Sequence, residues 1–260
     1  MTSSLFLLAR SAAFVGVMLG LASSVSFAQT QVLIDFGSAA NQTTVDSESR
    51  QWNNVVHTMT TGTTFGLVDS ANAATGVTFT LTQAFNVNDV NTNGLTNLNP
   101  DYPATATGDS LFGNVADFGG ESNVVPVLTL SGFNPNQSVD LSFFASRGLT
   151  SDNRIMRYEI TGASTTNLFL EANGNTGSHT VSASGILASV SGTITISVNH
   201  STVAESGLPT IGSGDQATGF AYLGALDIQY TAIPEPSASA ALGASVVLIG
   251  AVALRRRRAN

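Results

Sequence analysis

Between residues 29 and 233 the chain alternates apolar and polar residues in short runs, the pattern of strands that bury one face. The runs are rich in Val, Ile, Leu, Phe and Thr, and clusters of Gly, Asn, Asp and Ser separate them. No window in this region keeps a helical apolar stripe for three turns. The pattern predicts an all-β domain, a jelly-roll-like β-sandwich. Its expected strands are Val32–Phe36, Val77–Leu81, Val127–Leu130, Val139–Phe143, Tyr158–Ile160, Leu168–Leu170, Thr193–Val198 and Leu226–Tyr230.

The first 28 residues form a different kind of segment. Arg10 precedes an apolar stretch over residues 12–22, and Ser26 and Ala28 place small residues where a signal peptidase reads them. This order predicts a secretory signal peptide over residues 1–28, cleaved by signal peptidase after Ala28. The alternative is a retained N-terminal anchor, which the short apolar stretch disfavours.

The last 27 residues contain a second apolar segment. Residues 238–254 are 17 residues without a charge, which as a helix reach roughly 26 Å, enough for a thin hydrocarbon core. Four arginines follow, and their charge would keep that end on the cytoplasmic side. They are Arg255, Arg256, Arg257 and Arg258. The pattern therefore predicts a C-terminal membrane-spanning helix and a domain, residues 29–233, that lies outside the cytoplasm.

A Pro-Glu-Pro triplet, Pro234, Glu235 and Pro236, stands immediately before this apolar segment. The order of triplet, span and arginine cluster resembles the PEP-CTERM sorting signal of Gram-negative bacteria. The resemblance implies recognition by an exosortase, a membrane-embedded cysteine transpeptidase that removes the tail, residues 234–260. The precursor would then be held at the inner membrane transiently, and the mature form would reach the cell surface or the extracellular matrix. The alternative is that the two prolines form a stiff spacer.

Charge excludes one class of partner. Four arginines stand against sixteen carboxylates between residues 29 and 233, a formal charge of −12, and the chain has no lysine and no cysteine. A field of that sign repels phosphate backbones, so we expect no nucleic-acid binding, whereas neutral glycans remain possible partners. Without disulfides the domain depends on its core, for which its length is sufficient.

Three segments of the domain also loosely resemble exported galactose-binding-like domains. They are Leu33–Gly37, Leu141–Arg147 and Ala221–Ile228. The resemblance implies a β-sandwich and makes carbohydrate binding an expectation, although a fold by itself does not fix a function.

Arg147, Arg154 and Arg157 fall within 11 residues of an otherwise acidic domain. Guanidinium, carboxylate and amide groups can bracket sugar hydroxyls, and loops on a rigid sandwich commonly carry recognition. The candidate residues for binding an extracellular polysaccharide are therefore Arg147, Asp152, Asn153 and Arg154. The alternative, which we favour, is that the arginines pair locally with Asp152 and Glu159 and secure a hairpin. Trp52 and Tyr102 are candidate stacking aromatics, with core positions as their alternative.

The sequence offers one partial metal motif. Asp89, Asn91 and Asn93 match the first half of a calcium loop, but the position of the bidentate carboxylate is Pro100. An ordinary Asn-rich loop is the alternative that we favour. The three histidines have no zinc-ligand spacing. We therefore expect no metal and no cofactor.

Catalytic motifs are incomplete. Gly108–Leu111 reads like the nucleophile block of GDSL esterases, but no Asp-x-x-His follows, so Ser110 has no positioned base. Glu159 and Glu171 are carboxylates that could serve a glycoside hydrolase, although no spacing argument pairs them. The sequence thus predicts an exported, non-catalytic protein with an adhesive or structural role and possible carbohydrate binding. An extracellular polysaccharide-acting hydrolase is the alternative.

Overall fold

The computed structural model describes residues 29–96, 101–175 and 179–231. The expected signal peptide and sorting tail lie outside these residues. The helices that the model describes, α1 (Ala104–Thr107) and α2 (Val203–Ser206), have four residues each, and no described helix is long and apolar enough to cross a membrane. Gln29–Ala232 forms one compact unit with its own hydrophobic core, so this segment is suitable for study as a separate domain.

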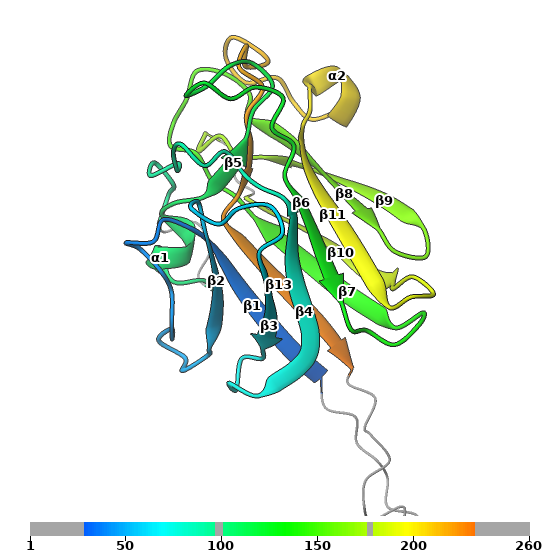
Figure 1. Ribbon diagram of the computed structural model, residues 1–260. Helices are drawn as coiled ribbons and strands as arrows, with labels where there is room; N and C mark the ends of the chain where they lie inside the picture. Colours follow the sequence, from blue (N-terminus) through cyan, green and yellow to red (C-terminus); the bar gives the residue numbers. More distant parts are fainter. Residues whose placement is uncertain (1–28, 97–100, 176–178, 232–260) are drawn as a thin grey trace, which may run out of the picture. The chain divides into compact units, whose positions relative to one another are not determined.

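Two large sheets form the predicted β-sandwich, and a third sheet has two strands (Figure 1). The first sheet has five strands in the order β10 (Thr180–Leu187), β7 (Ser138–Phe144), β13 (Ala225–Thr231), β1 (Gln29–Gly37) and β2 (Trp52–Val56). The second has six strands in the order β3 (Thr64–Val68), β4 (Ala74–Gln83), β6 (Val127–Ser131), β11 (Thr193–His200), β8 (Ile155–Thr161) and β9 (Thr165–Glu171). The jelly-roll-like arrangement stays a prediction.

The alternation of apolar and polar residues explains which strands the sequence predicts. Each of the eight expected runs lies inside a strand, and β6 and β11 alternate buried and half-buried positions as a one-sided strand must. The strands β2, β3, β5 (Leu111–Gly113), β10 and β12 (Ala221–Leu223) were not expected. The reason is clearest for β10, an edge strand in which small and polar residues separate Val181 from Ile186 and Leu187, so it has no regular apolar period.

The core lies between the two sheets. Phe143 from β7 and Tyr158 from β8 stack there with ring centres 4.4 Å apart and ring planes at 14°. The Tyr158 hydroxyl, fully buried, donates to the Tyr222 carbonyl oxygen at 2.8 Å. This hydrogen bond links the core to the segment that carries the site described below.

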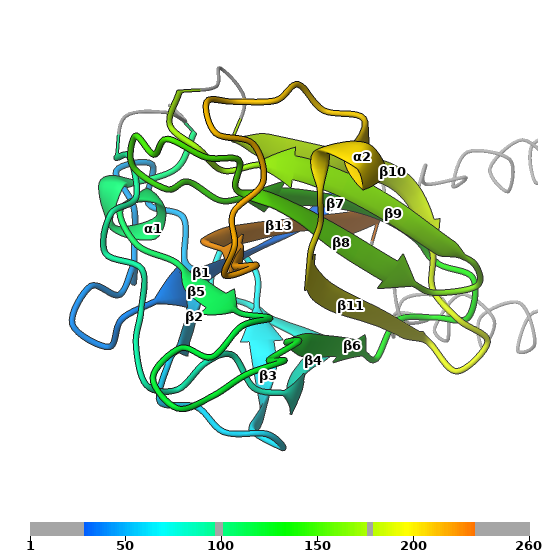
Figure 2. The ribbon, with the colours of Figure 1, turned by 90° about the horizontal axis from the view of Figure 1, so that it is seen from above.

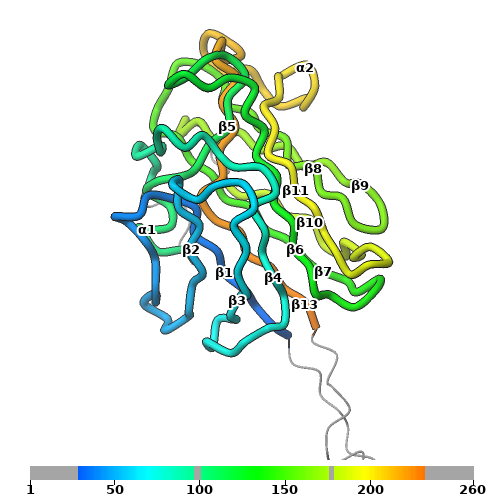
Figure 3. The backbone as a smooth tube through the Cα atoms, viewed as in Figure 1, coloured from blue at the N-terminus to red at the C-terminus, as the bar shows by residue number. Residues whose placement is uncertain are grey.

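β1 and β13 pair antiparallel, with Gln29 opposite Thr231 and Asp35 opposite Ala225. The first and last strands of the domain therefore lie side by side. At the end of these strands where Asp35 pairs with Ala225, a small two-stranded sheet forms from β5 (Leu111–Gly113) and β12 (Ala221–Leu223). Figure 2 looks at the domain from this end, and Figure 3 follows the loops that gather around β5.

Candidate functional site

A pocket opens beside β5 and β12, with a cavity volume of about 240 Å³. Its wall comes from the loop after β4, the loop between β7 and β8, and the segments that flank the small sheet. The side chains that matter most for its chemistry are Asp89, Phe118, Arg147, Arg154, Phe220 and Tyr222. Residues that the sequence suggested for two separate sites, Asp89–Asn93 and Arg147 with Arg154, therefore line one pocket.

Aromatic rings form one side of the pocket. Phe112 and Tyr222 are register partners on β5 and β12, and both are buried. Phe118 and Phe220 are half-buried and contact each other edge to face, with ring centres 5.2 Å apart. Phe112 contacts both of them in the same geometry. A partly exposed ring with a buried ring behind it is a rigid apolar surface of the kind that can take the face of a sugar ring.

The side chain of Arg154 lies against the aromatic side of the pocket. Its guanidinium carbon lies 5.8 Å from the centre of the Phe220 ring, within the range of a cation–π contact. Its Nε donates to Asp152 Oδ1 at 3.0 Å, and its Nη1 donates to Gln216 Oε1 at 2.7 Å and to the Tyr222 hydroxyl at 3.3 Å. Arg154 thus joins the loop before β8 to the segment before β12.

Arg147 approaches the same tyrosine. Burial raises the pKa of Tyr222, and the positive charges and hydrogen bonds of Arg154 and Arg147 act in the opposite direction. The backbone of Arg147 is held on both sides, because its N–H donates to the Ala172 carbonyl at 2.7 Å and its carbonyl accepts from the Gly174 N–H at 2.9 Å. The Tyr222 hydroxyl is therefore flanked by two guanidinium groups.

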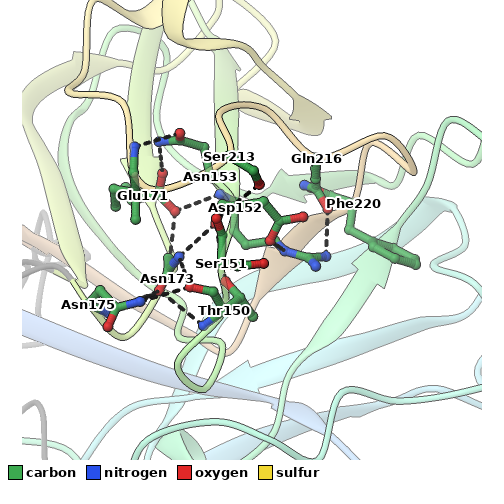
Figure 4. A network of polar contacts seen from close by, with 12 residues as sticks. Thr150, Ser151, Asp152, Asn153, Glu171, Asn173, Asn175, Ser213, Gln216 and Phe220 are labelled. Atoms are coloured by element: carbon green, nitrogen blue, oxygen red, sulfur yellow. Dashed lines mark hydrogen bonds and ion pairs between the residues drawn. The ribbon is translucent and has the colours of Figure 1, made fainter.

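Asn153 has a different environment from its neighbours. Its Nδ2 donates to Glu171 Oε2 at 2.8 Å and to the Pro209 carbonyl at 3.0 Å, and its Oδ1 accepts from the Ile211 N–H at 2.8 Å. The residue is 1% exposed. Figure 4 shows the network that Asn153 forms with Glu171 and Asn173. Because both polar atoms of this amide are already bonded within the protein, Asn153 is a structural residue, and Arg147 and Arg154 are the members of the predicted set that line the pocket.

The loop that resembles half a calcium site is held by its own hydrogen bonds. Asn91 is buried; its Nδ2 donates to Ser110 Oγ at 2.8 Å and to the Ser146 carbonyl at 3.1 Å, while its Oδ1 accepts from the Asn93 N–H at 3.1 Å. Asp89 is exposed on the pocket side. Over residues 29–96, 101–175 and 179–231, no group of three or more His, Asp or Glu side chains is placed to hold a metal ion. Ser110 is fully buried.

The two carboxylates of the hydrolase alternative lie apart on the β8–β9 hairpin. Glu171 is opposite Ile155, whereas Glu159 is four residues further along β8, about 13 Å at the rise of a strand. Glu171 Oε1 accepts from the Arg154 and Asn173 N–H groups, and its Oε2 accepts from Asn153. This pair therefore gives the hydrolase alternative no geometric support.

Trp52 and Tyr102 are core residues. Trp52 is 2% and Tyr102 is 9% exposed, and their rings meet edge to face at 5.6 Å. They pack with Leu33 and Phe144 on the face of the first sheet that points away from the second. The aromatic residues of the pocket are instead Phe118, Phe220 and Tyr222, which the sequence analysis did not single out. Only the turn residues around Phe118 and Phe220 could have indicated that these rings sit in loops.

No family model matches the sequence, and no curated protein matches it. Among solved structures, TmCBM61 in complex with β-1,4-galactotriose is similar at 10% identity and a TM-score of 0.27, over 46% of this chain and 70% of that one. A family 35 carbohydrate-binding module from an environmental isolate matches at 15% identity and a TM-score of 0.23, over 46% of this chain and 90% of that one. Isomalto-dextranase of Arthrobacter globiformis T6, complexed with panose, matches at 14% identity and a TM-score of 0.28, over 78% of this chain and 32% of that one. Because these TM-scores are below 0.5, the similarities do not indicate which ligand this chain binds.

Proposed function

We propose that the domain is a non-catalytic carbohydrate-binding module and that a glycan binds in the pocket beside β5 and β12. The observation that carries the proposal is the convergence of two arginines on half-buried aromatic rings in one concave site. Apolar rings can contact the face of a sugar, while fixed guanidinium donors and the Asp89 carboxylate bind its hydroxyls.

The rigidity of the pocket wall supports this proposal. The pocket is lined by loops that the sandwich holds in place, and Arg154 is fixed by Asp152, Gln216 and Tyr222 before any ligand arrives. A preformed site loses less conformational entropy on binding than a flexible one.

The test is a glycan array probed with the domain Gln29–Ala232 and with its Phe220→Ala variant. We expect binding to a subset of glycans and its loss in the variant, because a half-buried ring is removed from the pocket wall. Phe65→Ala is the matched control: Phe65 is also a half-buried ring, stacked on Phe79 at 5.1 Å, but it lies on β3 away from the pocket lining. Absence of binding to every arrayed glycan would contradict the proposal.

We propose further that the protein is exported by its signal peptide and sorted by an exosortase through its C-terminal tail, to act at the cell surface or in the extracellular matrix in adhesion or structure. The support is the order of Pro234–Pro236, the apolar segment and Arg255–Arg258 in the sequence. Intact-mass measurement of the surface-released protein tests it. A mature form from Gln29 to the region 234–237 is expected, whereas a form that retains residues 238–260 would indicate a simple membrane anchor.

A further inference from the structure

We infer that the glycan bound in this pocket carries a carboxylate group, as a uronic acid does, and that Arg147 is the residue that binds it. This inference rests on the proposed function and specifies the class of sugar.

Three of the four arginines in the domain have an acidic partner. Arg50 pairs with Asp46 at 2.7 Å, Arg154 pairs with Asp152 at 3.0 Å, and Arg157 pairs with Glu205 and Glu159. Arg147 forms no ion pair with any residue that the structure describes. The short segments 97–100 and 176–178 contain no acidic residue that could supply one. In a domain with sixteen carboxylates against four arginines, one guanidinium is thus left without a counter-charge, and it lines the pocket.

Most of the hydrogen-bond donors of Arg147 have no side-chain partner among the described residues. A guanidinium group offers five N–H donors in a planar fork that matches the two oxygens of a carboxylate. The Tyr222 hydroxyl is the one side-chain partner that the described residues give Arg147, so most of the fork remains available. Because the backbone of Arg147 is fixed by Ala172 and Gly174, little order has to be gained when a ligand binds.

The pocket is lined by charged groups of both signs. Asp89 lines the same cavity and forms no ion pair with a described arginine. Among the residues that the structure describes, the pocket therefore presents one cation and one anion that have no ion-pair partner. A ligand with several adjacent negative charges would be repelled by Asp89, whereas a sugar ring with one carboxylate and free hydroxyls satisfies both groups, the carboxylate at Arg147 and a hydroxyl at Asp89.

The experiment compares ligands that differ by a single charge. Titration calorimetry of the domain Gln29–Ala232 would use oligosaccharides that carry one terminal galacturonate, glucuronate or mannuronate on otherwise neutral sugars, together with the methyl ester of each, which keeps the sugar ring and removes the single charge. At least one acid form should bind tenfold or more tightly than its ester. Arg147→Gln should weaken binding of that acid form by roughly 10- to 100-fold, the usual effect of losing a charged hydrogen-bond partner, and leave the ester unchanged.

The matched control is Arg157→Gln, which removes an arginine from β8 that lies outside the pocket lining and should change neither affinity. Equal affinity of acid and ester for the unmodified domain would overturn the inference without any variant. An equal loss of both forms in Arg147→Gln would also overturn it, because Arg147 would then bind hydroxyls. Tighter binding of a sulfated oligosaccharide than of every uronate would assign the site to sulfate and overturn it too. In these cases a glycan still binds and the proposed function stands; if no acidic or neutral glycan binds, the proposed function itself fails.

Discussion

The guanidinium group of Arg154 lies over the ring of Phe220, 5.8 Å from its centre, and also donates to the hydroxyl of Tyr222 two residues further along the chain. One side chain from the loop before β8 thereby fixes the ring and the hydroxyl that line the pocket. The local pair between Arg154 and Asp152, which the sequence offered as an alternative to ligand binding, is present as well. Arg154 therefore holds the pocket wall whether or not it also contacts a ligand.

Arg154→Ala should weaken both the pocket and the fold. Removing the side chain leaves Gln216 and Asp152 without their partner, and charged hydrogen bonds of this kind contribute about 1–3 kcal/mol. We expect the free energy of unfolding in urea to fall by about 1–2 kcal/mol, with glycan affinity reduced at least tenfold. Arg157→Ala, which breaks partly exposed ion pairs, should cost less than about 1 kcal/mol. Unchanged stability and affinity in Arg154→Ala would contradict this account.

Asn153→Ala should be more destabilising than its position in a loop suggests. The amide connects β9, through Glu171, to the segment that contains Pro209 and Ile211, and its removal leaves buried partners unpaired. We expect a loss of about 2–4 kcal/mol in urea unfolding. The comparison is Asn175→Ala, an exposed asparagine of the same network, which should cost less than about 1 kcal/mol. Equal effects of the two substitutions would show that burial of Asn153 is not what matters.

Asp35 should make the domain less stable as the pH rises. Burial raises its pKa from 3.8 to about 7, and the nearby charge of Asp109 adds to the shift, while hydrogen bonds from Thr43 oppose it. Between pH 4 and 7 the folded state therefore binds more protons at Asp35 than the unfolded state. The contribution of this group is most favourable below about pH 4 and is lost as the pH rises to 7, with a slope of at most about 1.4 kcal/mol per pH unit.

Asp35→Asn removes this titration and keeps an acceptor for the Thr43 N–H, which Asp35 Oδ2 binds at 2.8 Å. The measurement is the free energy of unfolding of both proteins from pH 4 to 7. The stability of the unmodified domain relative to Asp35→Asn should decline steadily over that range. A difference that stays constant with pH would show that Asp35 ionises as an ordinary exposed carboxylate does.

Gly37→Ala should perturb the contact with Asp109. A Cβ at Gly37 would lie 2.4 Å from Asp109 Oδ1 and 2.7 Å from its Cγ, so the carboxylate must move and its hydrogen bond from the Ser38 N–H at 2.8 Å is strained. We expect a loss of about 1–3 kcal/mol, observed as a lower melting temperature. Gly66→Ala on β3 is the control, because nothing lies within 4 Å of its Cβ position. Adding Asp109→Ala to Gly37→Ala should cost less than the sum of the single changes, and additive costs would rule out the clash.

The β-sandwich is predictable from the amino-acid sequence alone. Runs such as Val32–Phe36 and Thr193–Val198 alternate strongly enough to fix which side chains face the core, because the period of a strand is two residues and burial of one face is the dominant stabilising term. The edge strand β10 and the strand β2, which contains two asparagines, escaped prediction, since their pairing is set by neighbouring strands and by their own backbone hydrogen bonds rather than by an apolar pattern.

The roles of the polar motifs become visible only in the folded domain. The loop Asp89–Asn93 and the arginines 147 and 154 are more than 50 residues apart in the sequence, and the hydrogen bonds from Asn91 to Ser146 and from Gly148 to Asn93 bring their loops together. Asn153 and Asp152 are adjacent in the sequence, yet one is enclosed in a hydrogen-bond network and the other pairs with Arg154 beside the pocket. Successive side chains of an extended chain point in opposite directions, and which direction meets the pocket depends on how the sandwich ends are joined. The direction in which a polar side chain points is therefore a property of the folded domain, and no local sequence pattern indicates it.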